Sequence, residues 1–297
     1  MKILIIGSEG FIGGHLKRFF SNLHEVYGGD VQDFGSSENY FRLDKQNSDF
    51  EVLFSKIKFD VCINASGNGS VPISLNKPVF DFELNVTNTI KILDAIRIHN
   101  PECKYINLSS AAVYGNPVDL PIKEISDLKP LSPYGWHKLY AEQICREYYY
   151  LYNIQTINLR LFSVYGENLK KQLFWDLYQK CLRSNEVELF GSGSETRDFI
   201  YVDDLINAVD CVIQNGLFNG EAVNVASGIE TKIKDVATIF INEINSDISL
   251  KFNMIVKPGD PLHWRADISL LKSFGFNNQV SIENGLKNVV LWLKENK

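Results

Sequence analysis

The sequence predicts an α/β fold in which a doubly wound parallel sheet is covered by helices on both faces and carries a smaller, interleaved cap. Three observations predict it. Short apolar strands alternate with amphipathic helices through the first half of the chain, a glycine cluster follows the first strand directly, and no proline- or serine-rich linker separates the two halves. The 297 residues leave room for one large domain or for two that share a cleft.

The alternation of the two periods gives the order of the expected elements. We expect strands at residues 3–6, 26–30, 40–43, 61–64, 104–108 and 156–161, and helices at residues 11–23, 48–57, 79–99 and 132–152. Pro101 ends the helix at 79–99, because proline cannot continue a helical hydrogen-bond ladder. The crossovers between parallel strands should be right-handed.

The alternation loosens after residue 162, where polar loops interrupt helices at about 172–183, 203–214, 232–244 and 281–294. We therefore expect a first domain at residues 1–162, to which residues of about 198–226 return. Residues 163–297 should mainly form the cap.

Composition and charge exclude several classes of protein. The chain has 30 Lys and Arg against 36 Asp and Glu, a net charge of −6, which disfavours binding to polymeric nucleic acid or to a membrane surface. No apolar run is long enough to span a bilayer. The five cysteines are scattered without a Cys-x-x-Cys pair, so we expect reduced thiols and a cytoplasmic location. The five histidines lack metal-ligand spacing, and no metal is expected.

The first motif, Gly7-Ser8-Glu9-Gly10-Phe11-Ile12-Gly13, follows a strand and opens a helix. Such glycines allow a tight turn and a close approach of pyrophosphate to the helix N-terminus, which predicts a Rossmann-type dinucleotide site. Asp30 ends the next strand, where a carboxylate binds ribose hydroxyls and repels a 2′-phosphate, so the cofactor should be NAD and not NADP. Asp44, after the third strand, could contact adenine or simply cap the strand end.

The second motif combines Tyr134 and Lys138, which lie four residues apart on one face of a helix. We expect the lysine charge to lower the pKa of the phenol, so that Tyr134 can exchange a proton with an alcohol or carbonyl during hydride transfer. Ser110 ends a strand whose C-terminus should line the ligand cleft, and its hydroxyl could bind the substrate oxygen.

These motifs resemble those of the extended short-chain dehydrogenases/reductases, specifically the NAD-dependent epimerase/dehydratase family, which acts on nucleotide sugars. The resemblance covers nearly the whole chain and includes the segments at 110–115, 196–204 and 258–260. It implies that Tyr134 is the general acid/base, that Lys138 holds the nicotinamide ribose, and that Ser110 is the catalytic hydroxyl. It also implies that Asn85 touches the cofactor or supports the active-site backbone, although a helix-surface amide is an equally simple interpretation.

A nucleotide-diphosphate sugar needs cations for its phosphates. Arg197 matches the family's phosphate-binding arginine, and Lys257 and Arg265 flank the late Pro-Gly-Asp segment. Ser163 stands where epimerases often have asparagine, so we count it among the substrate-binding candidates.

Departures from the family pattern leave the reaction open. Ala111-Ala112 replaces the Asp-Glu pair of the dehydratases, which disfavours a 4,6-dehydratase. The preference for NAD favours a 4-epimerase of a UDP- or dTDP-sugar, while Ser163 leaves room for a 4-keto-6-deoxy nucleotide-sugar reductase. A non-catalytic NAD-binding sensor is a further alternative, against which the intact Ser110, Tyr134 and Lys138 argue. The resemblance also implies polysaccharide biosynthesis and a homodimer formed through the helices at 79–99 and 132–152.

Overall fold

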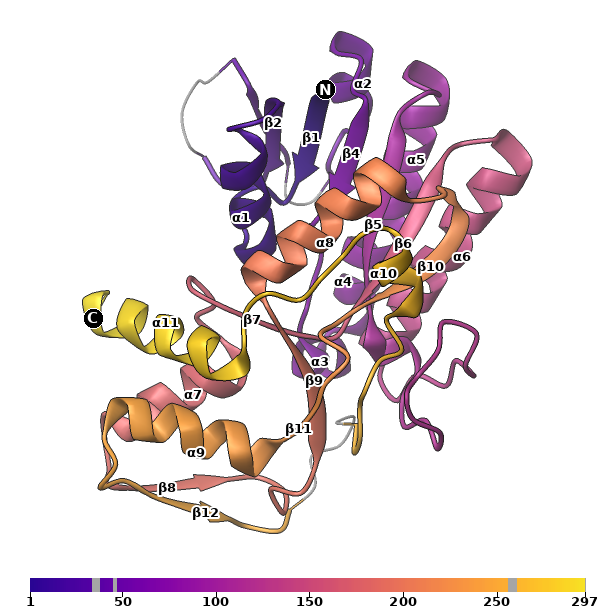
Figure 1. The fold of residues 1–297 in the computed structure, drawn as a ribbon. Helices are drawn as coiled ribbons and strands as arrows, with labels where there is room; N and C mark the ends of the chain where they lie inside the picture. The colour runs from indigo at the N-terminus through magenta and orange to yellow at the C-terminus, as the bar shows by residue number, and fades with distance from the viewer. Residues whose placement is uncertain (34–37, 45–46, 256–260, 297) are drawn as a thin grey trace.

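A parallel sheet forms the centre of the molecule, as the sequence predicts, and it has a seventh strand, β10, that was not among the six expected ones. The computed structural model describes residues 1–33, 38–44, 47–255 and 261–296. Its large sheet has the order β10-β6-β5-β4-β1-β2-β3, and all its pairings are parallel (Figure 1). The strands are β1 (Lys2–Ile6), β2 (Glu25–Asp30), β3 (Tyr40–Arg42), β4 (Val61–Asn64), β5 (Lys104–Ser110), β6 (Thr156–Leu161) and β10 (Asn219–Val225).

Helices cover both faces of this sheet, because successive side chains of each strand point to opposite sides. In β1, Ile3 and Ile5 enter one apolar core, and Leu4 and Ile6 enter the other. The first core lies under α1 (Phe11–Phe20), α8 (Val202–Asn215) and α10 (Ser269–Ser273). The second lies under α2 (Glu51–Lys56), α5 (Asn88–His99) and α6 (Pro133–Tyr152).

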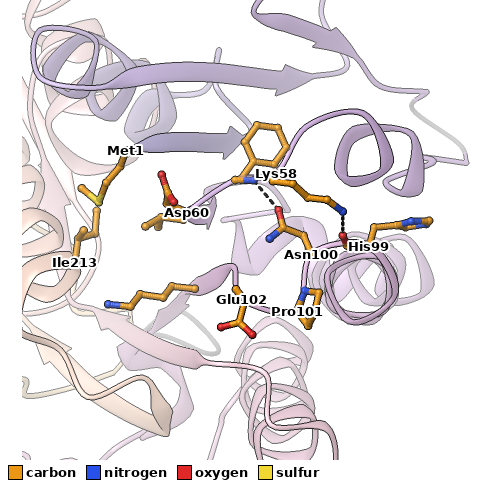
Figure 2. Close-up of a pocket in the computed structure, with 11 residues that line it drawn as sticks. Met1, Lys58, Asp60, His99, Asn100, Pro101, Glu102 and Ile213 are labelled. Carbon is orange, nitrogen blue, oxygen red and sulfur yellow. Dashed lines mark hydrogen bonds between the residues drawn. The ribbon is translucent and has the colours of Figure 1, made fainter.

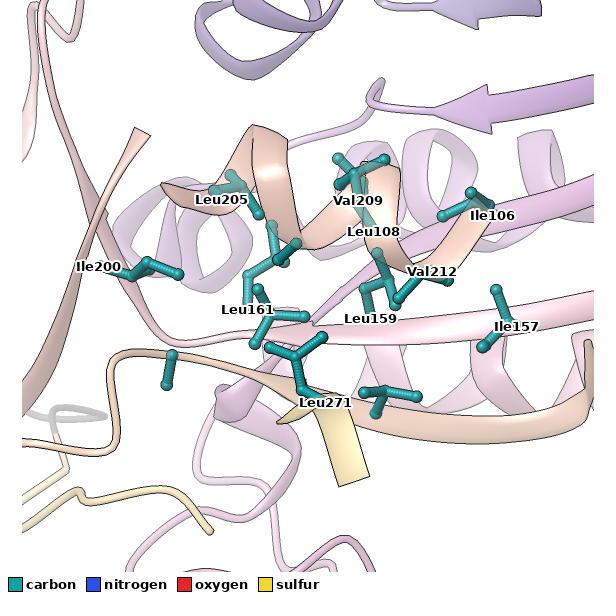
Figure 3. Close-up of a cluster of buried hydrophobic side chains, with 14 of the residues drawn as sticks. Ile106, Leu108, Ile157, Leu159, Leu161, Ile200, Leu205, Val209, Val212 and Leu271 are labelled. Carbon is teal, nitrogen blue, oxygen red and sulfur yellow. The ribbon is translucent and has the colours of Figure 1, made fainter. Parts of the chain in front are cut away.

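Helix α8 shows how a late segment completes the sheet. Leu205, Val209 and Val212 of α8 lie over Leu108 of β5 and Leu159 of β6, and all five are buried (Figure 3). Each such side chain contributes about 1.5–3 kcal/mol when it is removed from water. The large sheet therefore depends on residues far along the chain, through α8 and β10.

The remaining segments form a second body with its own apolar core. A three-stranded sheet has the order β11-β9-β7, and β8 and β12 pair in parallel. These elements are β7 (Ser163–Tyr165), β8 (Glu186–Leu189), β9 (Thr196–Tyr201), β11 (Glu230–Lys232), β12 (Ser249–Phe252), α7 (Gln172–Cys181), α9 (Ile233–Ile244) and α11 (Ile282–Glu295). The five short strands were not expected from the sequence.

The prediction of a single helix at residues 79–99 is wrong in detail. The structure has α4 (Pro78–Phe82), a π-helical segment η1 (Glu83–Thr87) and then α5. The Asn85 side-chain amide donates to the Asp81 carbonyl oxygen at 3.2 Å, so a side chain competes for a carbonyl that the α-helical ladder would use. Two further short segments, α3 (Val71–Asn76) and the 3₁₀ turn η2 (Ala111–Val113), were also not expected.

A buried ion pair fixes α6 on β5 and β6. The Arg160 guanidinium of β6 donates to both carboxylate oxygens of Glu142 on α6, with the shortest N–O distance 2.7 Å. Ser109 of β5 donates to the same carboxylate at 2.5 Å, and Arg160 also donates to the Tyr114 hydroxyl at 2.8 Å. All four residues are buried, so the position of α6 is set by charge-assisted hydrogen bonds as well as by apolar packing.

We expect Glu142→Gln to lower the free energy of unfolding by about 3–5 kcal/mol, because Arg160 would keep a buried charge without a counter-ion. Urea unfolding measures the change. The control is Glu186→Gln, which removes an exposed pair with Lys251 at 2.6 Å and should cost less than about 1 kcal/mol. Equal losses in the two variants would contradict the role given to Glu142.

Candidate functional site

The predicted site residues converge on the carboxyl edge of the large sheet. Gly7 follows β1, Asp30 is the last residue of β2, and Ser110 is the last residue of β5. The strand order reverses at β1, since the chain continues to β2 on one side and to β4 on the other. In parallel sheets such a reversal opens a crevice beyond the strand ends, where ligands bind.

The glycine motif has the geometry that a dinucleotide requires. Gly7 has a φ of +83°, and a Cβ atom on Gly13 would lie 2.0 Å from the Gly7 carbonyl oxygen. Only glycine tolerates both conditions. Gly10 is the N-cap residue of α1 and makes no side-chain cap, so the first N–H groups of α1 suit a phosphate. Phe11 and Ile12 begin α1, where Ile12 packs against the apolar core.

Asp30 is largely buried beside the glycine turn. One carboxylate oxygen accepts from the Glu9 backbone N–H at 3.0 Å, and the other accepts from the Gln32 N–H at 3.2 Å. These bonds aim the carboxylate across the mouth of the turn, as ribose binding requires. Asp44 is exposed after β3, and its carboxylate accepts from the Asn47 N–H at 2.7 Å, which matches the capping alternative for this residue.

Tyr134, Lys138 and Ser110 lie together. Ser132 caps α6 by accepting from the Gly135 N–H at 3.2 Å, which places Tyr134 in the first turn of the helix. The Ser110 side chain is near enough to the Tyr134 hydroxyl to lower its pKa by hydrogen bonding. Lys138 is buried, its Nζ lies 5.9 Å from the centre of the Tyr134 ring, and it donates to the Leu108 carbonyl oxygen at 2.9 Å.

The expected lowering of the phenol pKa is not found with the protein's own groups. Burial raises the pKa of Tyr134, the hydrogen bond with Ser110 opposes this effect, and the charge of Asp81 adds to it. Burial lowers the pKa of Lys138 to about 8, against the charges of Asp81 and Glu142. Local spacing suggested the opposite direction for the phenol because it could not reveal how far the pair is shielded from water.

Asn85 is buried in η1 and is oriented by three acceptors. Its Nδ2 donates to the Asp81 carbonyl oxygen, the Asp81 carboxylate and the Asn68 carbonyl oxygen at 3.2–3.3 Å. Its Oδ1 is buried and accepts no hydrogen bond from the described residues. A bound group could satisfy this acceptor. Together with the uncapped helix and the carboxylate of Asp30, it makes the residues present fit NAD.

Two of the substrate-side candidates, Ser163 and Arg197, lie in the second body, whereas Arg265 lies between Trp264 and Ala266 of the first core. Arg197 is on β9, its guanidinium lies 5.7 Å from the centre of the Trp264 ring, and Arg265 follows that tryptophan directly. Ser163 begins β7, which pairs with β9 in parallel, in register with Phe199. Ser163 and Arg197 are therefore held on neighbouring strands. Lys257 lies outside the described residues.

One pair near Asn85 and Tyr134 was not expected from the sequence. His137 is buried, and its Nδ1 lies 2.5 Å from a carboxylate oxygen of Asp81, which is also buried. Asp81 was not singled out, although its spacing of four from Asn85 was visible. Among the described residues, no group of His, Cys, Asp and Glu could hold a metal ion.

A hollow of about 570 Å³ lies at the opposite edge of the sheet (Figure 2). Lys58, Asp60 and Asn100 line it, and each is already bonded within the chain. Asn100 Oδ1 accepts from the Phe59 N–H at 2.6 Å, for example. None of the predicted site residues lines this hollow. It therefore plays no part in the candidate site.

The comparisons with known proteins agree with this geometry. The model of the NAD dependent epimerase/dehydratase family matches residues 3–226. The chain is 30% identical to a putative UDP-glucose 4-epimerase of Methanocaldococcus jannaschii, with 99% of each chain covered. The matches confirm the predicted family resemblance, the enzyme class and NAD as the cofactor.

Two solved structures are similar over the full length of this chain. One is a UDP-glucuronic acid 4-epimerase from Bacillus cereus in complex with UDP-glucuronic acid and NAD, with a TM-score of 0.89, 27% identity and complete coverage of both chains. The other is a UDP-N-acetylglucosamine 4-epimerase from Methanobrevibacter ruminantium, with a TM-score of 0.89, 26% identity and coverage of 100% and 99%. The predicted Rossmann-type fold is confirmed. Within the described residues, no helix is both long and apolar enough to cross a bilayer.

We expect NADH to bind and 2′,5′-ADP to compete with it only feebly, because the Asp30 carboxylate repels a 2′-phosphate. Asp30→Ser should strengthen binding of 2′,5′-ADP by about tenfold or more. Fluorescence titration of NADH with the competitor measures both. Asp33→Ser is the matched control, since Asp33 is an exposed acid paired with Arg42 at 2.6 Å. Tight binding of 2′,5′-ADP by the unchanged protein would contradict the role given to Asp30.

Proposed function

The chain belongs to the NAD dependent epimerase/dehydratase family, and on this premise we propose that it is a UDP- or dTDP-sugar 4-epimerase. The observation that carries the proposal is the grouping of Ser110, Tyr134 and Lys138 at the end of β5, on the same sheet edge as the glycine turn. A protein that only bound NAD would need the glycine turn but not this acid/base group.

The reaction follows from these three side chains. NAD, when bound, supplies the acceptor of the hydride from C4 of the sugar. Tyr134 takes the proton of the C4 hydroxyl, Ser110 hydrogen bonds the same oxygen, and Lys138 holds the nicotinamide ribose beside them. The C4–H and O–H bonds break as the C4 carbonyl forms. After the keto sugar turned, the bound cofactor would supply the hydride to the other face of C4, and Tyr134 would give the proton back to the C4 oxygen.

The second body and the segment that contains Arg265 supply the substrate contacts in this proposal. Arg197 and Arg265 bind the diphosphate, with Lys257 as a third cation, and Ser163 faces the sugar. The division into a cofactor domain at 1–162, with about 198–226 returning to it, and a cap at 163–297 belongs to the same proposal. The relatives support the choice of a nucleotide sugar, since the similar Bacillus cereus structure contains UDP-glucuronic acid and NAD.

A 4-keto-6-deoxy nucleotide-sugar reductase is the second candidate. It shares the proton transfer by Tyr134 but exchanges its cofactor in each turnover. Ser163 favours it, because epimerases of the family often carry asparagine there. Ala111 and Ala112 continue to disfavour a dehydratase, since neither side chain can carry a proton.

We also propose that the protein forms a homodimer through α4, α5 and α6, in which the helices of two copies form a bundle. Apolar side chains on this face are exposed to solvent, among them Val79 at 70%, Trp136 and Tyr140 at 43% and Phe82 at 40%. Contiguous exposed apolar side chains are typical of an interface. A cytoplasmic location and a role in polysaccharide biosynthesis are parts of the same proposal.

We expect the protein to interconvert the two C4 isomers of a UDP- or dTDP-sugar without added cofactor. Tyr134→Phe should reduce this rate by a factor of about 100 to 10,000, because no group remains to move the proton. A panel of nucleotide sugars and 4-keto-6-deoxy nucleotide sugars, followed by chromatography with and without NADH, measures both. The control is Tyr150→Phe, which changes an exposed residue of α6. Stoichiometric consumption of NADH with a keto sugar would identify the reductase, and full activity of Tyr134→Phe would refute the mechanism.

Light scattering at micromolar concentration should give the mass of a dimer. Trp136→Glu should give a monomer, because a charge would be buried in the apolar bundle. Ile125→Glu, at a 91% exposed loop residue, should leave the mass unchanged. A monomeric mass for the unchanged protein would refute the dimer.

A further inference from the structure

A buried carboxylate lies behind the proposed acid/base pair. Asp81 of α4 is fully buried, and its carboxylate is not paired with a lysine or arginine among the described residues. One oxygen lies 2.5 Å from Nδ1 of His137, which is 8% exposed. The other accepts from Asn68 Nδ2 at 2.5 Å and from Asn85 Nδ2 at 3.2 Å. A buried charge is costly, so these three donors are needed to hold it.

The three donors come from three different segments around the site. Asn68 belongs to the loop after β4, Asn85 to η1, and His137 to α6, on which α4 packs (Figure 1). Asp81 therefore sets the spacing between the loop after β4 and the first turns of α6. It also fixes the Asn85 amide, whose Oδ1 accepts no hydrogen bond from the described residues and faces Gly67, where a Cβ atom would lie 2.5 Å away.

His137 occupies the turn of α6 that separates Tyr134 from Lys138. Its ring packs edge-on against Phe82 at 5.3 Å between centres, at the base of a shallow apolar hollow lined by Pro78, Val79 and Phe82. Its neighbours among the described residues are aromatic or apolar apart from the carboxylate, and they include the Tyr140 ring at 6.3 Å between centres. A hydrogen bond in such surroundings is stronger than in water, so the bond to Asp81 holds this turn firmly.

The charge of Asp81 acts on both members of the pair. It raises the pKa of Tyr134, in the same direction as burial. It also raises the pKa of Lys138, against the larger effect of burial, which lowers it. The other groups near the pair are Ser110 of β5, whose hydrogen bond lowers the pKa of Tyr134, and Glu142 of α6, which acts on Lys138 and is itself paired with Arg160 of β6. Among these groups, the Asp81 carboxylate is the one that changes the pKa of both Tyr134 and Lys138.

We propose that Asp81 is a positioning residue for the acid/base pair: through His137 it holds the turn of α6 that carries Tyr134 and Lys138 against the loop after β4, and it places one buried negative charge behind both. The inference rests on the proposed function, in which Tyr134 exchanges the proton. Asp81 itself touches neither substrate nor cofactor in this scheme.

The test is the pH profile of kcat/KM for isomer exchange in Asp81→Asn, which keeps the size of the side chain and removes its charge. Because the charge raises the pKa of Tyr134, its removal should move the acid-side half-maximum to lower pH, by about half a unit to one unit. Loss of positioning should lower kcat by about tenfold. KM for the nucleotide sugar should change by less than about twofold, since binding contacts remain.

His137→Gln separates the two parts of the inference. It keeps the charge of Asp81 and removes the ring, so kcat should fall while the acid-side half-maximum does not move to lower pH. Asp94→Asn is the control, since it removes an exposed carboxylate of α5 paired with Arg97 at 2.7 Å and should leave the profile unchanged. NADH titration and light scattering should show that all three variants still bind the cofactor and keep the mass of the unchanged protein.

A wild-type kcat and profile in Asp81→Asn would overturn the inference. If that variant does not fold, His137→Gln decides, and an unchanged kcat there would overturn it equally. Activity in Tyr134→Phe would refute the proposed function instead, so the two failures are distinguishable.

Discussion

The buried ion pair between Glu142 and Arg160 is the interaction on which the candidate site depends most. It ties α6 to β6, and the bond from Ser109 ties the same carboxylate to β5. Tyr134, Lys138 and Glu142 recur every four residues, so they occupy roughly one face of α6. Docking the helix through Glu142 therefore also brings Tyr134 to Ser110 and Lys138 to the Leu108 carbonyl. The ion pair between Glu142 and Arg160 therefore stabilises the fold and also sets the geometry of the acid/base group.

Burial at this edge has two opposing consequences. Shielding from water raises the pKa of the Tyr134 phenol and lowers that of Lys138, which disfavours the charged form of each. The same shielding strengthens every hydrogen bond and charge that acts on the pair. The protein's own groups therefore favour the protonated phenol.

Much of this site could be predicted from the sequence because its signals are local. The glycine motif, Asp30 at a strand end and Tyr134 four residues before Lys138 are short patterns, each with a direct physical meaning. Two features had no local signal. The contact between Asp81 and His137 joins residues 56 positions apart. The short strands β8 and β12 pair although about 60 residues separate them. Each segment alone resembles a loop, because only the pairing makes it a strand. The direction of the phenol pKa depended on burial, which no spacing reveals.

The most direct test of the account follows a deuterium atom placed at C4 of the UDP- or dTDP-sugar substrate that the protein converts. If hydride leaves C4, stays on a retained cofactor and returns to the opposite face, mass spectrometry and NMR will find the deuterium at C4 of the isomerised product. Excess free NAD in the solution will then remain unlabelled. Deuterium lost to solvent, or transferred to the free cofactor pool, would contradict the account.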